Sequence, residues 1–251
     1  MTCLTYNKLL VSDWKNKSVK LIDTKSGTVA CSTHLLSHPY GICMFDDDTA
    51  LVAMPDEEIL QFIRTNWKTL KLYKTLNVSG TMHDITTCCE NIVVSYLSPP
   101  RVEMWSMTGS SEGKIVKTMM GRNTFRSPEH LTTSTDQQSI YVSDNGTSMI
   151  TRLDNRLQIL QTFSHDLLRH PMGITALSDD EILVADGDSN AIVSLQPSTG
   201  TCVKLLGEED GIAMPRAVAY SPTQKTLYVA SSVYAHWKDE IDTIVQMYKH
   251  E

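Results

Sequence analysis

His170–Leu195 reads HPMGITALSDDEILVADGDSNAIVSL. Its three short apolar runs, at 173–177, 182–185 and 191–195, alternate with turns rich in Asp, Gly, Ser and Asn. Short β-branched runs separated by such turns are typical of consecutive antiparallel strands. After one more turn, a fourth apolar run follows at 202–206. The stretch therefore predicts a four-stranded meander.

The same pattern recurs along the whole chain, because each copy has a second strand in which valine is followed by Ser or Ala. The spacing of these valines ranges from 41 residues (Val11 to Val52) to 48 residues (Val94 to Val142). Six copies at these spacings predict an all-β, six-bladed β-propeller of four-stranded blades. We place this single domain over residues 1–251, with blades at about 1–36, 37–79, 80–125, 126–168, 169–212 and 213–251.

The first strand of most copies starts with a proline, which a strand tolerates at its first residue. The third copy has Met82-His83-Asp84-Ile85 at this place, and the others are Pro39-Tyr40-Gly41-Ile42, Pro128-Glu129-His130-Leu131, Pro171-Met172-Gly173-Ile174 and Pro215-Arg216-Ala217-Val218. Gly41 and Gly173 predict places where the inner strand approaches another backbone too closely for a side chain.

A proline-x-Gly-Ile start, a V-[SA]-D second strand and a polar turn before an apolar third strand resemble NHL repeats. NHL repeats form the six-bladed propeller at the C-terminus of many tripartite-motif (TRIM-NHL) ubiquitin ligases. The resemblance implies a non-catalytic domain without cofactors that binds a protein substrate or partner. Ubiquitin transfer would then belong to a RING domain, and an upstream RING, B-box and coiled-coil region is expected in a full-length protein.

The composition is that of an ordinary soluble domain, with 41% hydrophobic residues and 22 Lys+Arg against 29 Asp+Glu. No apolar run approaches the roughly 20 residues that a membrane helix needs, so no membrane contact is expected. The six cysteines lack metal-binding spacing, which favours a reduced, cytoplasmic protein. The last blade runs out of sequence after a third strand at 243–248, so we expect either three strands with an exposed edge or a chain that is part of a longer protein.

In the five blades that have the strand-start mark, the residue after it is expected near the central axis: Tyr40, His83, Glu129, Met172 and Arg216. This diverse set could form a small-molecule or peptide site, or only a solvated rim. Four histidines near these positions (His38, His83, His130 and His170) occupy different offsets in the repeat, so they should not converge on a metal. A lactonase-like metal site of Glu129, Asn145 and Asp186 is an alternative, although Asp and Asn suit turns better here.

Binding of single-stranded RNA is a second alternative, since some NHL propellers bind RNA on one face. That mode needs a basic face to follow the phosphates. The turns of the corresponding face carry more acidic than basic residues, as does the whole chain with its net charge of −7. RNA binding would therefore depend on a local patch of Arg101, Arg122 and Arg126.

Four aromatic residues are expected in turns of this same face: Trp14, Tyr96, Tyr234 and Trp237. Aromatic residues and Arg often anchor protein interfaces, and the long predicted turn at 231–242 is the preferred contact loop. The sequence thus favours a non-catalytic protein-interaction module over an RNA-binding propeller and over a metal-dependent hydrolase or lyase.

Overall fold

The computed structural model describes residues 1–4, 7–66, 68–108, 112–120, 124–234 and 241–249. It is a six-bladed β-propeller whose blades have three or four antiparallel strands, which confirms the predicted fold class. The described residues contain two short 3-10 helices, η1 (Pro55–Glu57) and η2 (Glu208–Asp210). None of the helices in the described part of the chain is long and apolar enough to cross a membrane.

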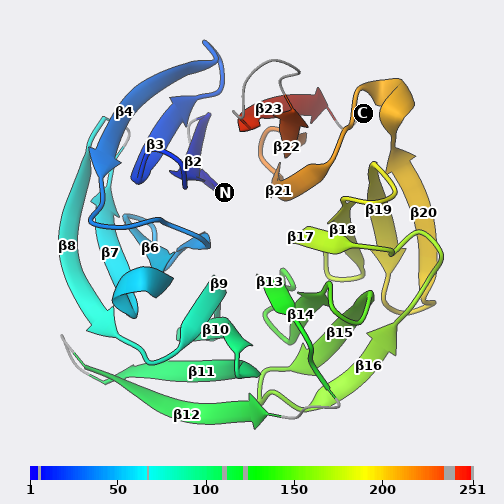
Figure 1. The fold of residues 1–251 in the computed structure, drawn as a ribbon, viewed down its shortest axis with the longest axis horizontal. Helices are drawn as coiled ribbons and strands as arrows, with labels where there is room; N and C mark the ends of the chain where they lie inside the picture. Colours follow the sequence, from blue (N-terminus) through cyan, green and yellow to red (C-terminus); the bar gives the residue numbers. More distant parts are fainter. Residues whose placement is uncertain (5–6, 67, 109–111, 121–123, 235–240, 250–251) are drawn as a thin grey trace. The chain divides into compact units, whose positions relative to one another are not determined.

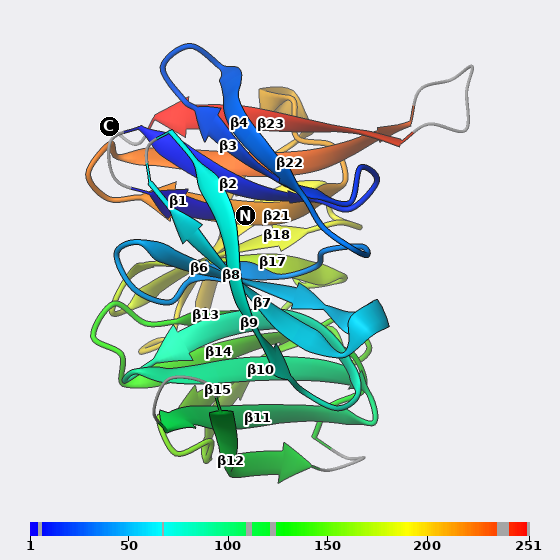
Figure 2. The ribbon, with the colours of Figure 1, turned by 90° about the vertical axis from the view of Figure 1, so that its left-hand side faces the viewer.

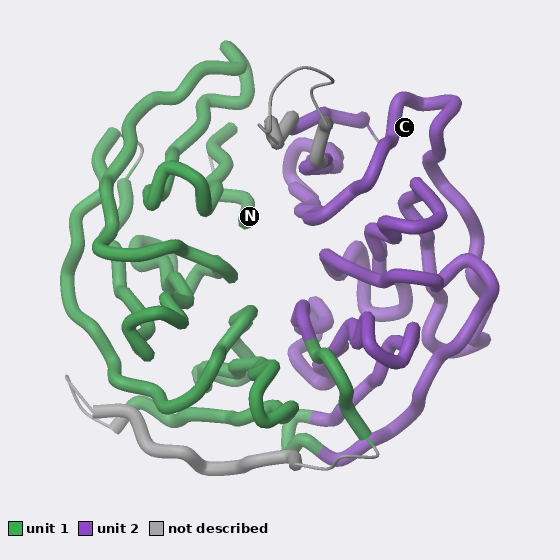
Figure 3. The backbone as a smooth tube through the Cα atoms, in the orientation of Figure 1, with its two compact units in different colours: residues 1–128, 155–157 green, residues 129–154, 158–251 purple. Residues whose placement is uncertain are grey.

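The chain divides into two compact units, shown in green and purple in Figure 3. Unit 1 comprises Met1–Pro128 with Asn155–Leu157, and unit 2 comprises Glu129–Asp154 with Gln158–Glu251. Each unit contains the greater part of three blades, and each is described by itself below.

Unit 1 holds the first three sheets, whose strands follow chain order within each blade (Figures 1 and 2). The first blade consists of β1 (Thr2–Leu4), β2 (Lys8–Asp13), β3 (Ser18–Asp23) and β4 (Thr28–His34). The second consists of β5 (Ile42–Met44), β6 (Thr49–Met54), β7 (Ile59–Thr65) and β8 (Leu70–Asn77). The third consists of β9 (Thr81–Cys88), β10 (Asn91–Ser98), β11 (Pro100–Thr108) and β12 (Glu112–Met120).

Unit 2 holds the remaining sheets, and its last blade has three strands. The fourth blade consists of β13 (Pro128–Thr133), β14 (Ser139–Asp144), β15 (Met149–Asp154) and β16 (Ile159–Phe163). The fifth consists of β17 (Pro171–Ser178), β18 (Glu181–Asp186), β19 (Ala191–Gln196) and β20 (Thr201–Leu206). The sixth consists of β21 (Pro215–Ser221), β22 (Thr226–Tyr234) and β23 (Ile241–Lys249). The four runs predicted in the fifth blade are therefore confirmed as strands.

Most apolar residues of the second and third strands in the first five blades are buried. In unit 2, one core cluster joins Tyr141 and Ile150 of the fourth blade to Ile182 and Val184 of the fifth. A second cluster joins Leu183 of the fifth blade to residues of the sixth. Complete burial of such a side chain contributes about 1.5–3 kcal/mol, so the blades within a unit stabilise one another.

Two glycines mark close contacts between inner strands, as predicted. A Cβ atom on Gly41 would lie 2.6 Å from the Cα atom of Asp84, and one on Gly173 would lie 2.6 Å from the Cα atom of Ala217. Real Cβ atoms do not approach a backbone so closely. The absent side chains therefore allow the first strands of adjacent blades to meet.

Two local predictions need correction. β5 starts at Ile42, three residues after the proline that was expected to begin it. The predicted long turn at 231–242 is strand at both of its ends, because β22 extends to Tyr234 and pairs with β23 from Ile241 onward. Residues 235–240 of this predicted contact loop lie outside the described residues.

Candidate functional site

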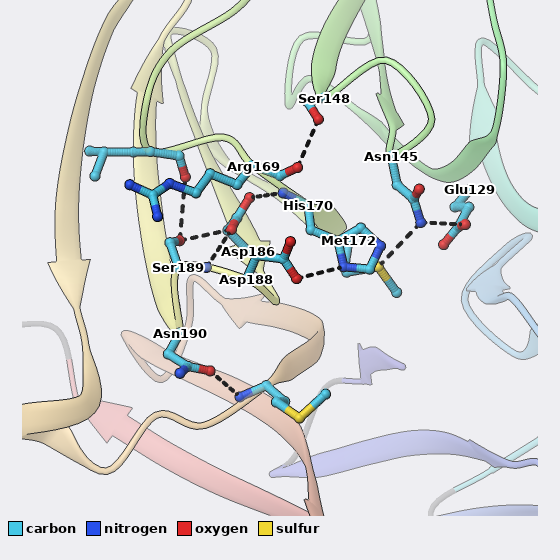
Figure 4. Close-up of polar contacts among 12 residues, drawn as sticks. Glu129, Asn145, Ser148, Arg169, His170, Met172, Asp186, Asp188, Ser189 and Asn190 are labelled. Atoms are coloured by element: carbon cyan, nitrogen blue, oxygen red, sulfur yellow. Dashed lines mark hydrogen bonds and ion pairs between the residues drawn. The ribbon is translucent and has the colours of Figure 1, made fainter.

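A group of polar side chains lies where the fourth and fifth blades of unit 2 begin their inner strands (Figure 4). Glu129 is the second residue of β13, and Asn145 directly follows β14. The Asn145 amide nitrogen Nδ2 donates to Glu129 Oε1 at 2.7 Å and lies 4.0 Å from the sulfur of Met172. Three residues from three different strand ends are thus in contact, and we call Glu129, Asn145 and Met172 the contact line.

His170 stands next to this line, immediately before β17. Its ring Nδ1 lies 3.6 Å from Asp188 Oδ1, and its side chain is 31% exposed. A Cβ atom at position 187 would lie 3.2 Å from the His170 Nδ1 and 3.9 Å from the Met172 Cγ. Gly187 therefore leaves room for the His170 ring beside Met172 and places Asp188 next to it.

Asp186 holds two backbone segments in place, the one before β17 that carries His170 and the turn that carries Asp188. This fully buried carboxylate accepts the His170 backbone N–H at Oδ2 (2.8 Å). Its Oδ1 atom accepts both the backbone N–H and the hydroxyl of Ser189, at 2.9 and 2.8 Å. An Asp that bonds to the backbone two or three residues ahead is a typical turn former, so this prediction is confirmed.

The fourth blade repeats part of this arrangement. Asp144 is fully buried and accepts the backbone N–H of Thr147. Ser148 in the same turn donates its hydroxyl to the backbone oxygen of Arg169 at 2.7 Å, which ties this turn to the segment that carries His170. The hydroxyl of Ser143 likewise donates to the backbone oxygen of Met172 at 2.7 Å. The segment 169–172 is therefore held by hydrogen bonds from two neighbouring blades.

The alternative metal site of Glu129, Asn145 and Asp186 does not fit these contacts. Both oxygens of Asp186 already accept hydrogen bonds, Oδ1 from Ser189 in its own turn and Oδ2 from the His170 backbone. Asn145 presents an N–H donor, not an oxygen, toward Glu129. No group of three His, Cys, Asp or Glu side chains suited to a metal occurs among the residues that the structure describes.

The five predicted axial residues are divided between the two units. In unit 1, the rings of Tyr40 and His83 contact each other edge to face, with centroids 5.2 Å apart. In unit 2, Glu129 and Met172 share the contact line described above, and Arg216 is exposed on β21. Met172 is buried, so its side chain forms a wall of the site and not a solvated rim.

Tyr96 and Arg101 were expected in an exposed turn, and both are buried instead. Tyr96 lies in β10 and pairs with Arg101 of β11, whose guanidinium carbon lies 3.6 Å from the centre of the Tyr96 ring. Arg101 Nε also donates to Glu103 Oε1 at 2.7 Å. Burial in this network removes Arg101 from the proposed RNA-binding patch.

The remaining predicted contact residues have mixed positions. Trp14 is exposed and stacks on His38, with ring centroids 4.4 Å apart. Arg126 is exposed, and Tyr234 ends β22. Arg122 and Trp237 lie outside the described residues. The pairing of His170 with Asp188 was not predicted, although the His-Pro start and the Asp-Gly-Asp turn are visible in the sequence.

No protein-family model and no curated protein sequence matches the chain. Solved structures match over most of its length. Virginiamycin B lyase from Staphylococcus aureus has a TM-score of 0.67 and 18% identity, covering 99% of this chain and 83% of the lyase. A streptogramin B lyase has a TM-score of 0.67 and 15% identity, covering 90% and 74%. Hydrazine synthase from Kuenenia stuttgartiensis has a TM-score of 0.66 and 14% identity, covering 91% and 72%.

These comparisons support the six-bladed propeller and correct the functional prediction. The expected TRIM-NHL assignment finds no support, because no NHL or tripartite-motif family model matches. The expectation of a non-catalytic recognition domain, and of a chain that is not an enzyme, is contradicted by structural neighbours that are lyases. At these identities the likeness itself establishes the fold.

Proposed function

We propose that the chain is an enzyme of the lyase or hydrolase class that transfers protons through His170 and Glu129. The observation that carries the proposal is the pairing of His170 with Asp188 beside the Glu129–Asn145–Met172 contact line. The propeller lyases among the structural neighbours support the class of reaction. One of those structures is a catalytically inactive histidine-to-alanine variant of virginiamycin B lyase with quinupristin.

His170 is suited to act as the general base. A carboxylate beside one nitrogen of an imidazole orients the ring and stabilises the imidazolium that forms when the other nitrogen accepts a proton. Asp188 lies beside Nδ1, and among the described residues nothing hydrogen-bonds to Nε2. The Nε2 atom can therefore take a proton from a carbon next to a leaving group, as in a lyase, or from water, as in a hydrolase.

Glu129 is suited to complement this base. The Asn145 amide holds one carboxylate oxygen by a 2.7 Å hydrogen bond, which fixes the orientation of the group. A second carboxyl group in the same site can, when protonated, donate its own proton to the leaving group or, when ionised, balance the positive charge that develops on His170. Two titratable groups from adjacent blades thus supply the two proton transfers that elimination or hydrolysis requires.

The test is an assay of the purified chain with quinupristin and a panel of lactones and esters. We expect product formation by the wild type and a loss of about 10²- to 10⁴-fold in kcat for His170→Gln, the usual contribution of a general base. The matched control is His34→Gln, an exposed histidine on β4 in unit 1, which should leave kcat unchanged.

Product masses distinguish the two reaction classes, because hydrolysis adds one water and elimination adds none. Glu129→Gln should lower kcat while the chain remains folded by circular dichroism. If the wild type leaves every compound of the panel unchanged, or if His170→Gln is as active as the wild type, the proposal is wrong.

A further inference from the structure

Arg216 lies beside the candidate site and has no role in the chemistry above. It is the second residue of β21, the position that Glu129 holds in β13 and Met172 in β17. A Cβ atom on Gly173 would lie 2.8 Å from the Arg216 backbone oxygen. The backbone of Arg216 therefore contacts the residue next to Met172, whose sulfur lies against Asn145.

The strand geometry presents this side chain to solvent. The register between β21 and β22 shifts between Pro215 and Ala217, so Arg216 lies at a bulge. β17 has a similar shift between Pro171 and Ile174, which places Met172 at the corresponding irregularity. Bulges turn a side chain away from the regular alternation of a strand and occur often next to active sites. Arg216 is exposed at its bulge, whereas Met172 is buried at the corresponding one.

Among the described residues, the Arg216 guanidinium makes no ion pair or hydrogen bond, although carboxylates are plentiful in unit 2. Three acidic residues of unit 2 have other partners: Asp188 lies beside His170, Asp186 accepts from Ser189, and Glu209 pairs with Lys204. A guanidinium has five N–H donors in a planar fork that matches a carboxylate with two parallel hydrogen bonds. An exposed arginine whose donors have no partner among the described residues, and whose backbone contacts Gly173 next to the candidate site, is suited to bind an anionic group.

We infer that Arg216 anchors a carboxylate of the substrate, so that the substrates of this site are carboxylate-bearing esters or lactones. The inference rests on the proposed function, because it assigns specificity to the same site. Arg216 is a specificity residue here: it holds the far end of the substrate while His170 and Glu129 act on the bond that breaks. Glu129 and Asp188 would repel a carboxylate placed beside them, which favours the end of the site nearest Arg216.

The experiment compares matched substrates that differ only in charge. Each ester or lactone of the panel is offered with a free carboxylate and as the corresponding neutral amide. We expect the wild type to prefer the carboxylate form by about 10- to 100-fold in kcat/KM, the range of a charge-assisted hydrogen bond. Arg216→Gln should remove this preference mainly through KM and leave the rate on the neutral form unchanged. Lys225→Gln, at an exposed position in the turn between β21 and β22, removes an equal charge and should keep the preference.

A binding measurement separates this inference from the proposed function. Succinate is titrated into the isotope-labelled chain, and the NMR signal of the Arg216 side-chain Nε–H is followed. A saturable shift in the wild type supports the anchor even if no catalysis is found, since it needs no reaction. If the signal does not move, or if Arg216→Gln keeps the preference for carboxylate substrates, the inference is wrong. The proposed proton transfer is tested separately, by the kcat of His170→Gln.

Discussion

Asp186 and Asp188 are two residues apart in one turn, yet their environments differ sharply. Asp186 is fully buried and accepts three hydrogen bonds, from the backbone of His170 and from Ser189. The side chain of Asp188 is 68% exposed and contacts the His170 ring at 3.6 Å. The first residue therefore holds the backbone, and the second orients the proposed base.

This difference predicts a clear split between stability and activity. Asp186→Asn keeps the shape but replaces one acceptor oxygen by a donor, so it should lower the free energy of unfolding by about 1–3 kcal/mol. Asp188→Asn, at an exposed position, should change it by less than about 0.5 kcal/mol and should mainly lower kcat. Urea unfolding and the product assay measure the two effects. Equal stability losses in both variants would contradict the assigned roles.

At this scale the sequence predicts turns and close contacts better than it predicts pairs of functional side chains. Asp186 and Gly173 were predicted correctly because each follows from local backbone chemistry. The His170–Asp188 pair depends on how a turn in the fifth blade folds back over its first strand. Tyr96 was misplaced because β10 continues to Ser98 and β11 starts at Pro100, where a longer turn was expected.

The inner strands of adjacent blades are the elements that position the candidate site. β17 lies next to β21, and Gly173 permits this contact because it carries no side chain. The repeat period and the glycine pattern predict these strands from sequence alone. The length of β22 was not predicted. Ser231 and Ser232 near its end are typical of a turn, and their place in a strand depends on pairing with β23.

We expect Gly173→Ala to push β17 and β21 apart. The new Cβ would meet backbone atoms at 2.6–3.0 Å, and backbone cannot move aside as a flexible side chain can. Overpacking of this kind costs about 1–3 kcal/mol. The control is Ser178→Ala at the exposed end of the same strand, which should cost less than about 0.5 kcal/mol. Chemical denaturation of both variants measures the difference, and an unchanged midpoint for Gly173→Ala would show that the two strands are not in close contact.

Across the whole molecule, titratable groups limit stability at both ends of the pH scale. Hydrogen bonds lower the pKa of several carboxyl groups in both units, among them Asp23, whose pKa falls to about 2 chiefly because of Lys8, and Asp180, held by Ser198. Such groups stabilise the folded chain above their unfolded pKa, and that stabilisation is lost as the pH falls through the folded value. Acid should therefore weaken both units.

Alkaline pH should act on unit 1 through its thiols. Burial raises the pKa of Cys3 from 9.0 to about 12 and raises the pKa of Cys43 as well. Stability is fully present below about pH 9, where both the folded and the unfolded thiols are protonated, and falls from pH 9 toward 12 because only the unfolded thiols ionise freely. Each thiol then lowers the free energy of unfolding by up to about 1.4 kcal/mol per pH unit.

Urea midpoints at pH 7.5 and 10.5 test this expectation with a variant that lacks the titrating groups. The double variant Cys3→Ala and Cys43→Ala is less stable at neutral pH because it loses buried volume, so the informative quantity is the change between the two pH values. That change should be smaller in the double variant than in the wild type, whereas Cys89→Ala, which removes an exposed thiol, should behave like the wild type. If all three proteins lose the same stability between pH 7.5 and 10.5, other groups cause the pH dependence. Tyr96 is then the next residue to replace, by Phe, because burial raises its pKa as well.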